Sequence, residues 1–397
     1  MSILGACLVK RVIKMSELTK KLYYDDAYIS EFYANVLSVT ACDGGFDVVL
    51  DRTAFFPEEG GQSSDRGYIG TAGVDAVYEK DGIVHHVTNT APCGTNVFCR
   101  IDFDERFEKM QIHTAEHILC GIIHKKFGLD NVGFHLGADD VTFDISAPLT
   151  KEELSEVFAE ACEVVYKNIR IDTFFPSKDE LSAIEYRSKL DLTSNVRLVK
   201  IGDVDTCACC APHVSYTGEI GQIRFVFAEK HRGGMRIWMS AGRRAMRDSF
   251  AEHERMLRIS AMLSVPTSDA DTALEKYMSD TENLKYQLKE ARRIYAESLA
   301  RALPEVNGNL VYLVNDAGIE ELRSFVNCAI DKVSGILVAL CGGDGDYKYV
   351  IASNSVDVSK EVKVYNAALC GRGGGRGFAV QGSFAATLEE IKEYFEK

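Results

Sequence analysis

Two short motifs, more than ninety residues apart, constrain this chain more than any other feature of its sequence. His113 and His117 stand four positions apart in HTAEHIL, and Cys209 and His213 have the same spacing in CCAPH. On a helix, positions i and i+4 share a face with Cβ atoms about 6 Å apart, so two imidazoles can reach one ion about 2 Å from each nitrogen. Each pair alone is a weak signal. Together they predict a fold that brings both segments to one zinc ion with a Cys/His3 ligand set.

Neighbouring cysteines keep alternatives open. Cys207 and Cys210 flank Cys209 and are rival ligands, and Cys207-x-x-Cys210 also has the spacing of a redox pair. The 12 cysteines of the chain are irregularly spread, and the first residues lack the charge order of an export signal. We therefore expect reduced thiols, metal ligation and a cytoplasmic protein.

The same histidine pair has a second interpretation. His113-x-x-Glu116-His117 matches the inverted zinc-protease pattern, in which the histidines bind zinc and the glutamate is the base. That pattern requires a distant glutamate as third ligand, whereas this chain offers Cys209 and His213. An inverted-motif zinc metalloprotease stays the alternative enzyme, and a zinc-containing RNA-binding protein without activity is the non-enzymatic alternative.

The order of hydrophobic patterns predicts an α+β protein with several parts. The 397 residues suffice for two or three domains. Short alternating runs at 22–103 predict strands, and the helical spacing after them predicts a helix that begins at Asp104 and ends at Gly128. The predicted parts are an extension (1–21), a small β-barrel-like domain (22–103), an α+β zinc-binding domain (104–248), a helical linker, hairpin or coiled coil (249–303) and an α/β domain (304–397).

A seam of 3–4 spaced positions runs from Leu274 to Ser298 through four heptads with mixed occupancy. It predicts a helical arm or a modest coiled coil, and with it a homodimer.

Charge is unevenly distributed along an acidic chain. The formal net charge is −14, yet residues 230–258 hold eight Lys or Arg against three acids. A basic stripe of this kind suits a phosphate backbone, and we assign Arg236, Arg243 and Arg244 to it. A solvated helix face explains the pattern equally well.

Four stretches occur in the order seen in one family: DRTAFFPEEGGQSSDRGYI (51–69), RFEKMQIHTAEHIL (106–119), CCAPHVSYTGEIG (209–221) and GRGGGRGFAVQGS (371–383). In this order the chain resembles freestanding alanyl-tRNA editing proteins of the AlaX type, which are similar to the editing part of alanyl-tRNA synthetase. The resemblance covers nearly all of residues 15–397. The fourth stretch indicates the long form, with a C-terminal DHH-associated domain.

The resemblance implies hydrolysis of the ester that joins a wrong amino acid, chiefly serine and also glycine, to alanine tRNA. It places one zinc ion on His113, His117, Cys209 and His213. The family more often has Gly-Gly-Thr where this chain has Cys210-Ala211-Pro212. The departure keeps the ligand spacing and changes the wall of the pocket. No catalytic base is assigned.

The resemblance also implies a substrate pocket. The turn at Gly60 and Gly61 allows close backbone approach and is expected to leave Gln62 exposed as a hydrogen-bonding group. His135, in GFHLG, is expected near the hydroxyl of a seryl group. At the glycine-rich stretch no nucleotide-binding fingerprint is complete, and Arg372 and Arg376 are expected to contact tRNA.

Overall fold

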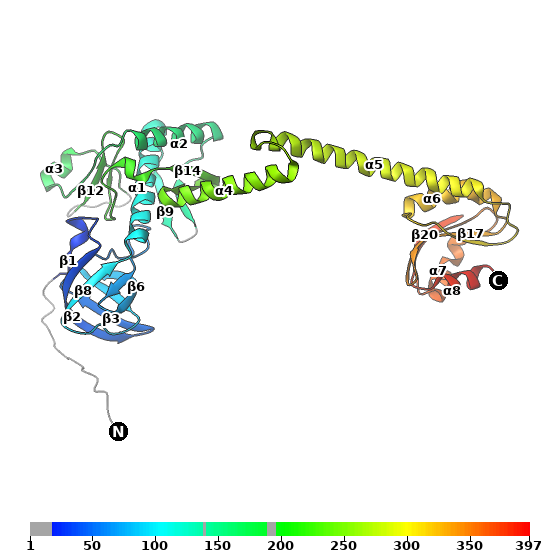
Figure 1. Ribbon diagram of the computed structural model, residues 1–397, viewed down its shortest axis with the longest axis horizontal. Coiled ribbons are helices and arrows are strands. Elements are labelled where there is room, and N and C mark those ends of the chain that lie inside the picture. Colours follow the sequence, from blue (N-terminus) through cyan, green and yellow to red (C-terminus); the bar gives the residue numbers. More distant parts are fainter. Residues whose placement is uncertain (1–17, 138–139, 189–195) are drawn as a thin grey trace, which may run out of the picture. The chain divides into compact units, whose positions relative to one another are not determined.

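The computed structural model describes residues 18–137, 140–188 and 196–397, which form two compact units divided between Arg255 and Met256 (Figure 1). Most of the predicted extension, residues 1–17, lies outside this description. Several sheets and helices confirm the mixed α+β class. The division into five parts stays a prediction. None of the helices described is both long and apolar enough to cross a membrane.

A closed six-stranded barrel opens the first unit. Its strands, in their order around the barrel, are β2 (Glu31–Cys42), β3 (Gly45–Leu50), β7 (Ile83–Thr88), β6 (Ala72–Lys80), β5 (Gly67–Ile69) and β8 (Asn96–Ile101). Alternation of buried and exposed side chains, as at Val97, Cys99 and Ile101, fills the interior. Two short strands, β1 (Lys20–Lys21) and β4 (Arg52–Thr53), form a separate parallel pair. The 3-10 helix η1 (Leu22–Tyr24) follows β1 in the chain.

Helix α1 (Phe103–Phe127) is the central element of the first unit. Asp102, not the predicted Asp104, is its N-cap, because the Asp102 side chain accepts a hydrogen bond from the backbone N–H of Glu105. Gly128 ends the helix with φ of 66°, as predicted. Every residue from Lys109 to Ile123 is buried, including several polar ones. A helix buried on all sides shows no clear amphipathic pattern, so its polar residues require partners inside the protein.

Two sheets and three helical segments surround α1. The four-stranded sheet has the order β14 (Ile223–His231), β15 (Gly234–Ala241), β10 (Val141–Ile145) and β9 (Asn131–Leu136). The three-stranded sheet consists of β11 (Ile171–Phe174), β12 (Leu198–Ile201) and β13 (Asp205–Ala208). The helical segments are α2 (Lys151–Tyr166), α3 (Lys178–Ala183) and the 3-10 helix η2 (Thr217–Ile220). The apolar side chains of both sheets, α2 and η2 form one core with α1, whereas α3 has no buried residue.

A glycine lets α1 and β13 approach closely. A Cβ atom built on Gly121 would lie 2.7 Å from Asp205 Cβ and 2.8 Å from the carbonyl oxygen of Val204, so any larger residue would push the two elements apart. This contact places the segment that follows β13 against the middle of α1. The two ligand pairs predicted from the sequence meet there.

The second unit is built on a five-stranded sheet. Its strand order is β16 (Leu310–Leu313), β17 (Ile336–Gly343), β18 (Asp346–Ser353), β20 (Ala379–Phe384) and β19 (Arg372–Arg376). Only the β16–β17 pair is parallel in this sheet. The accompanying helical segments are α6 (Ile319–Ala329), η4 (Ile330–Lys332), α7 (Val358–Ala368) and α8 (Leu388–Phe395).

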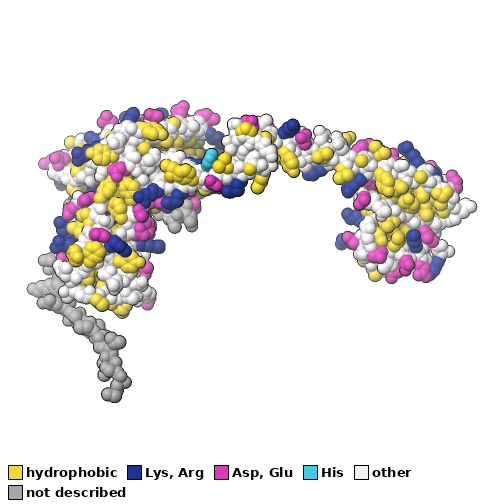
Figure 2. All heavy atoms as spheres, in the orientation of Figure 1, with side chains coloured by type: hydrophobic (Ala, Val, Ile, Leu, Met, Phe, Trp, Pro, Cys, Tyr) yellow, Lys and Arg dark blue, Asp and Glu magenta, His cyan; other side chains and the backbone are white. Residues whose placement is uncertain are grey.

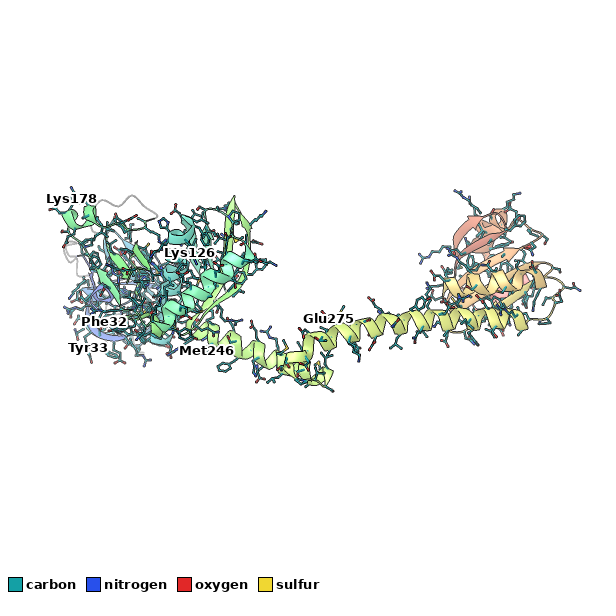
Figure 3. All side chains as sticks on the ribbon, turned by 90° about the horizontal axis from the view of Figure 1, so that it is seen from above. Phe32, Tyr33, Lys126, Lys178, Met246 and Glu275 are labelled. Atoms are coloured by element: carbon teal, nitrogen blue, oxygen red, sulfur yellow. The ribbon has the colours of Figure 1, made fainter. Side chains whose placement is uncertain are left out.

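Two helices run through the region predicted to be helical. Helix α4 (Gly242–Leu263) crosses the boundary between the units, and the 3-10 helix η3 (Thr267–Asp269) and α5 (Ala270–Ala302) follow it. In α5 only Ala270, Ala296 and Ala300 are buried. Figure 3 shows side chains that project above and below the ribbon of α5 near Glu275, and apolar side chains are visible among the exposed ones in Figure 2.

Candidate metal centre

The fold brings the two ligand pairs together. One ligand atom from each of His113, His117, Cys209 and His213 lies within 4.8 Å of the others, and the three histidines are buried. Cys209 Sγ is 3.7 Å from His113 Nε2 and 3.4 Å from His213 Nε2. A tetrahedral zinc ion with Zn–S of about 2.3 Å and Zn–N of about 2.0 Å separates such atoms by about 3.5 Å. The donor set therefore fits zinc in both chemistry and spacing.

Each histidine is oriented by a partner at its other ring nitrogen. His113 Nδ1 lies 2.9 Å from Gln62 Oε1, and His117 Nδ1 lies 3.1 Å from Asp205 Oδ2. His213 Nδ1 lies 3.0 Å from the hydroxyl of Thr114, which itself donates to the carbonyl of Met110. A donated Nδ1–H fixes the tautomer and leaves Nε2 free to ligate. All three rings thus have the arrangement found around protein-bound metals.

Charge distinguishes Cys209 from its rivals. Burial opposes a thiolate, but the neighbouring His113 and the hydrogen bonds from His113 and His117 outweigh burial and hold the pKa of Cys209 well below its usual value. Burial raises the pKa of Cys207 to about 11, and burial together with the charge of Cys209 raises that of Cys210 further. The thiolate is the form that binds metal. Cys209 is therefore the best prepared of the three thiols.

The imidazoles differ in protonation. Burial lowers the pKa of His213 to about 3, so this ring is neutral and ready to ligate. Burial also disfavours a charged His117, yet Cys207, the hydrogen bond to Asp205 and Cys209 together hold its pKa well above the usual value. A metal ion binding here must displace the proton of His117.

A second cluster shares one residue with the first. His117, Asp205 and Cys207 also lie close enough to hold an ion. Arg187, however, donates to both carboxylate oxygens of Asp205, at 2.8 and 2.9 Å. Both oxygens of Asp205 are therefore already paired with the Arg187 guanidinium. We interpret Asp205 as a hydrogen-bond partner of His117 and Arg187 and not as a metal ligand.

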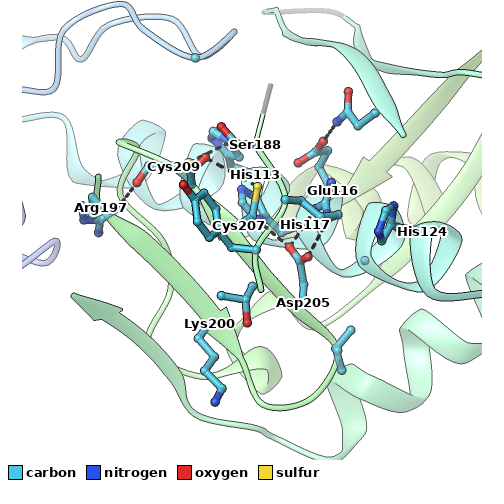
Figure 4. A pocket seen from close by; sticks show the side chains of 18 of the residues that line it. His113, Glu116, His117, His124, Ser188, Arg197, Lys200, Asp205, Cys207 and Cys209 are labelled. Atoms are coloured by element: carbon cyan, nitrogen blue, oxygen red, sulfur yellow. Dashed lines mark hydrogen bonds and ion pairs between the residues drawn. The ribbon is translucent and has the colours of Figure 1, made fainter. Parts of the chain in front are cut away.

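A cavity of 1230 Å³ opens beside the cluster. One face of α1 forms its floor over about 18 Å, at 1.5 Å per residue. The floor residues are His113, Glu116, His117, Gly121, His124 and Lys125. The walls come from the β12–β13 hairpin and from the segment around β9, and Figure 4 shows Cys207, Cys209 and Asp205 beside the histidines. The volume exceeds the range of about 300–1,000 Å³ usual for small-ligand sites.

The four residues predicted to form the substrate pocket differ in their position relative to the cavity. Gly60 lines the cavity. Gly61, with φ of 83°, packs so tightly on β9 that a Cβ would lie 2.4 Å from the carbonyl oxygen of Phe134. The expected exposure of Gln62 is wrong: its side chain is fully buried because this turn is pressed against β9 and directs Oε1 at His113. His135 is exposed and does not line the cavity, whereas the preceding Phe134 does and lies against His113.

Three arginines of the predicted basic stripe are paired with acids. Arg236 donates to both oxygens of Asp144 at 2.7 and 2.8 Å. Arg243 pairs with Asp104, and Arg244 pairs with Glu108. Arg372 and Arg376 lie exposed on β19, and among the described residues neither has an ion-pair partner. A role of these five arginines in tRNA binding stays a prediction.

Sequence reasoning missed the residues that support the cluster. Asp205 and Thr114 orient ligands, and Arg197 Nη1 donates to the carbonyl oxygens of Cys209 and Ala211, both at 2.9 Å. Thr114 lies inside HTAEHIL, and Asp205 lies four residues before Cys209. Their positions in the sequence do not reveal which histidine ring each of them contacts.

The chain is similar in sequence to several known proteins. Residues 196–237 match the second additional domain of threonyl and alanyl tRNA synthetases. The alanyl-tRNA editing protein AlaX-L of Pyrococcus horikoshii is 26% identical over 397 residues, covering 94% of this chain and 96% of that protein. The chain is therefore similar to this editing protein along almost the whole length of both.

Alanine–tRNA ligases are also similar. That of Halorubrum lacusprofundi is 31% identical over 86% of this chain, and that of Methanobrevibacter smithii is 30% identical over 92%. The chain spans only 39% and 44% of these ligases. The crystal structure of the C-Ala domain of Aquifex aeolicus alanyl-tRNA synthetase overlaps 24% of the chain at 20% identity, with a TM-score of 0.21 that is no evidence of a shared fold.

Proposed function

We propose that this protein is a cytoplasmic, zinc-dependent hydrolase that removes a wrong amino acid, chiefly serine and also glycine, from alanine tRNA. The observation that carries the proposal is the convergence of His113, His117, Cys209 and His213 into one cluster, three of whose members (His113, His117 and Cys209) line a large cavity. Similarity to an alanyl-tRNA editing protein over 94% of the chain supports the substrate class. Among the described residues no glutamate joins the cluster, which disfavours the inverted zinc-protease pattern.

The residues of the chain have separable tasks in this proposal. The four ligands would hold one zinc ion, which supplies a positive charge that can polarise an ester carbonyl or acidify water. Gln62, Asp205 and Thr114 fix the three imidazoles. Burial of the cluster excludes bulk water and strengthens electrostatic interactions with a bound ester. Arg197 holds the loop that carries Cys209.

Gln62 acts on the site through His113, because its side chain is fully buried and is not among the residues that line the cavity. Its buried Nε2 lacks a hydrogen-bond partner among the described residues. A buried donor without an acceptor costs about 1–3 kcal/mol.

The helix α5 supports a homodimer. It carries exposed apolar side chains along its length, including Leu274, Tyr277, Leu284, Leu288 and Tyr295, all of them at positions of the predicted seam. A long helix with an apolar stripe is stabilised mainly by packing. A second copy of the same seam would provide that packing.

The deciding assay measures deacylation of seryl-, glycyl- and alanyl-tRNA with the alanine acceptor, before and after zinc removal. We expect rapid hydrolysis of the seryl ester, slow hydrolysis of the alanyl ester, loss of activity with a chelator and recovery on adding zinc. Cys209→Ala should be inactive, and Cys93→Ala, at an exposed cysteine of the barrel region, should match the wild type. Binding of tRNA without hydrolysis would instead indicate an RNA-binding protein with structural zinc.

A further inference from the structure

Glu116 is the exception among the buried carboxylates of the described chain. These are Asp65, Glu116, Asp205 and Glu321. Three of them accept hydrogen bonds from an arginine or a backbone N–H, supplied by Arg106, Arg187 and Gly318 respectively. Among the described residues Glu116 has only neutral side-chain donors, the amide of Asn131 and the thiol of Cys120. A buried carboxylate normally has a cationic partner or several hydrogen bonds, because removing its charge from water is costly.

The two carboxylate oxygens of Glu116 are not equivalent. Asn131 and Cys120 both donate to Oε1, so Oε2 has no hydrogen-bond donor within the described part of the chain. Glu116 is among the residues that line the cavity, so its carboxylate borders the space that a ligand would occupy. The amide and thiol hold the carboxylate in place from one side. The other side is available to a ligand.

Glu116 stands beside the proposed reaction centre. It is three residues from His113 and adjacent to His117 on α1, and Figure 4 shows it next to His117. Side chains three positions apart on a helix have Cβ atoms about 5–6 Å apart. A ligand held at the metal cluster therefore reaches the Glu116 side of the cavity within the length of one amino acid.

The chemistry of an aminoacyl ester supplies the missing cation. Its α-ammonium group is two bonds from the carbonyl carbon, so it enters the cavity together with the reacting bond. A hydrogen bond between ammonium and carboxylate is charge-assisted and is about twice as strong as a neutral one. The hydroxyl next to the ester on the terminal ribose is neutral, like the donors that Glu116 already has, and leaves the charge uncompensated.

We propose that Glu116 Oε2 accepts a hydrogen bond from the α-ammonium group of the aminoacyl ester, which makes Glu116 the residue that demands a free amino group. This inference rests on the proposed function and identifies the α-ammonium group as the part of the substrate that Glu116 recognises. It replaces the protease role of Glu116 as a base with a role in substrate selection.

The test compares esters that differ only at the amino group. Full-length protein is given alanine tRNA bearing serine, and the same tRNA bearing the analogue in which a hydroxyl replaces the amino group. For the wild type we expect kcat/KM to favour serine by about 10- to 100-fold, the range for a hydrogen bond to a charged group. In Glu116→Gln this preference should fall to below about 3-fold, chiefly through KM for the seryl ester.

Controls separate this role from a structural one. The glutamine oxygen can still accept from Asn131 and Cys120, so folding and zinc content should match the wild type. Glu105→Gln, at a partly exposed position in the first turn of the same helix, should keep the full preference. A seryl ester on a terminal ribose that lacks the neighbouring hydroxyl should lose the same factor in wild type and Glu116→Gln. A loss confined to the wild type would assign Glu116 to the ribose and overturn the proposal.

A binding measurement keeps the inference independent of turnover. Calorimetry measures the dissociation constants of 3′-serylamino-3′-deoxyadenosine, whose amide resists hydrolysis, and of its hydroxy-acid counterpart. The difference between the two constants reports the contribution of the ammonium group. Tighter binding of the amino compound to wild type but not to Glu116→Gln supports the inference. Equal binding of both compounds to the wild type refutes it. Absence of seryl-tRNA hydrolysis with a preserved amino preference in binding would refute the proposed function alone.

Discussion

Removal of the Asp205 charge is the sharpest test of how the cluster is organised. Asp205 Oδ2 lies 3.1 Å from His117 Nδ1, on the side of the ring opposite to the proposed metal. Replacing such an outer partner typically costs 10- to 100-fold in metal affinity. Asp205→Asn keeps the shape and removes the charge, so we expect the zinc dissociation constant to rise about 10- to 100-fold, or about 1.4–2.7 kcal/mol.

The same substitution affects stability through Arg187. The Arg187 side chain is only 15% exposed and its pairing with Asp205 involves both carboxylate oxygens. Removing one member of a buried ion pair leaves the other uncompensated and costs about 3–5 kcal/mol. Arg187→Gln in the same protein removes the stranded charge. The double variant should therefore recover much of the free energy of unfolding without recovering zinc affinity.

The assay is a zinc competition with a chromophoric chelator at fixed pH, run beside urea unfolding of wild type, both single variants and the double variant. Zinc affinity is compared only where each protein is fully folded. Wild-type affinity in Asp205→Asn would refute the outer-partner role of Asp205. Recovery of affinity in the double variant would show that the loss came from a distorted fold.

Three further predictions address other parts of the chain. Burial lowers the pKa of His86 to about 4 from about 6.5 in the unfolded chain, so its contribution to stability is complete above pH 6.5 and is lost as pH falls toward 4. Urea unfolding of the wild type should lose about 3 kcal/mol over this interval, and His86→Gln should lose less. Replacing Arg372 and Arg376 by alanine should weaken tRNA binding and reduce the salt slope by up to about 0.9 for each phosphate that the protein no longer neutralises; an unchanged slope excludes them from the interface. Leu284→Lys with Leu288→Lys should convert a dimer into a monomer by sedimentation, and a monomeric wild type would exclude the seam as an interface.

The grouping of His113, His117, Cys209 and His213 was predictable because it depends on residue type and short-range spacing. His113 and His117 fall on one face of any helix, and the same spacing at Cys209 and His213 pointed to a shared ion before the fold was known. What brings the pairs together is a contact of α1 with β13, made possible by Gly121. A single glycine within a helical pattern does not predict such a contact, because its first effect on a sequence-based prediction is to lower the expected stability of the helix.

Side-chain direction on a strand was not predictable. In GFHLG the sequence favours His135 as the functional residue because of its chemistry, but the structure directs Phe134 at the cluster and His135 outward. Neighbours on a strand face opposite sides, so an error of one position in register exchanges them. The predicted exposure of Gln62 was wrong for a related reason. The turn that carries Gln62 packs on β9, and this long-range contact buries Gln62 as a partner of His113.

The departure from Gly-Gly-Thr can now be understood in terms of what each replaced residue contacts. Ala211 is fully buried in a small cluster with Tyr23 and Phe56, and its carbonyl oxygen is held by Arg197 together with that of Cys209. The backbone of the ligand loop is therefore fixed by contacts that do not need glycine or threonine. Cys210 instead adds a thiol to the cavity wall beside Gly60. The departure leaves the four clustered side chains in place and changes the wall of the cavity. Under the proposed function we therefore expect it to affect the choice between seryl and glycyl esters and not the affinity for zinc.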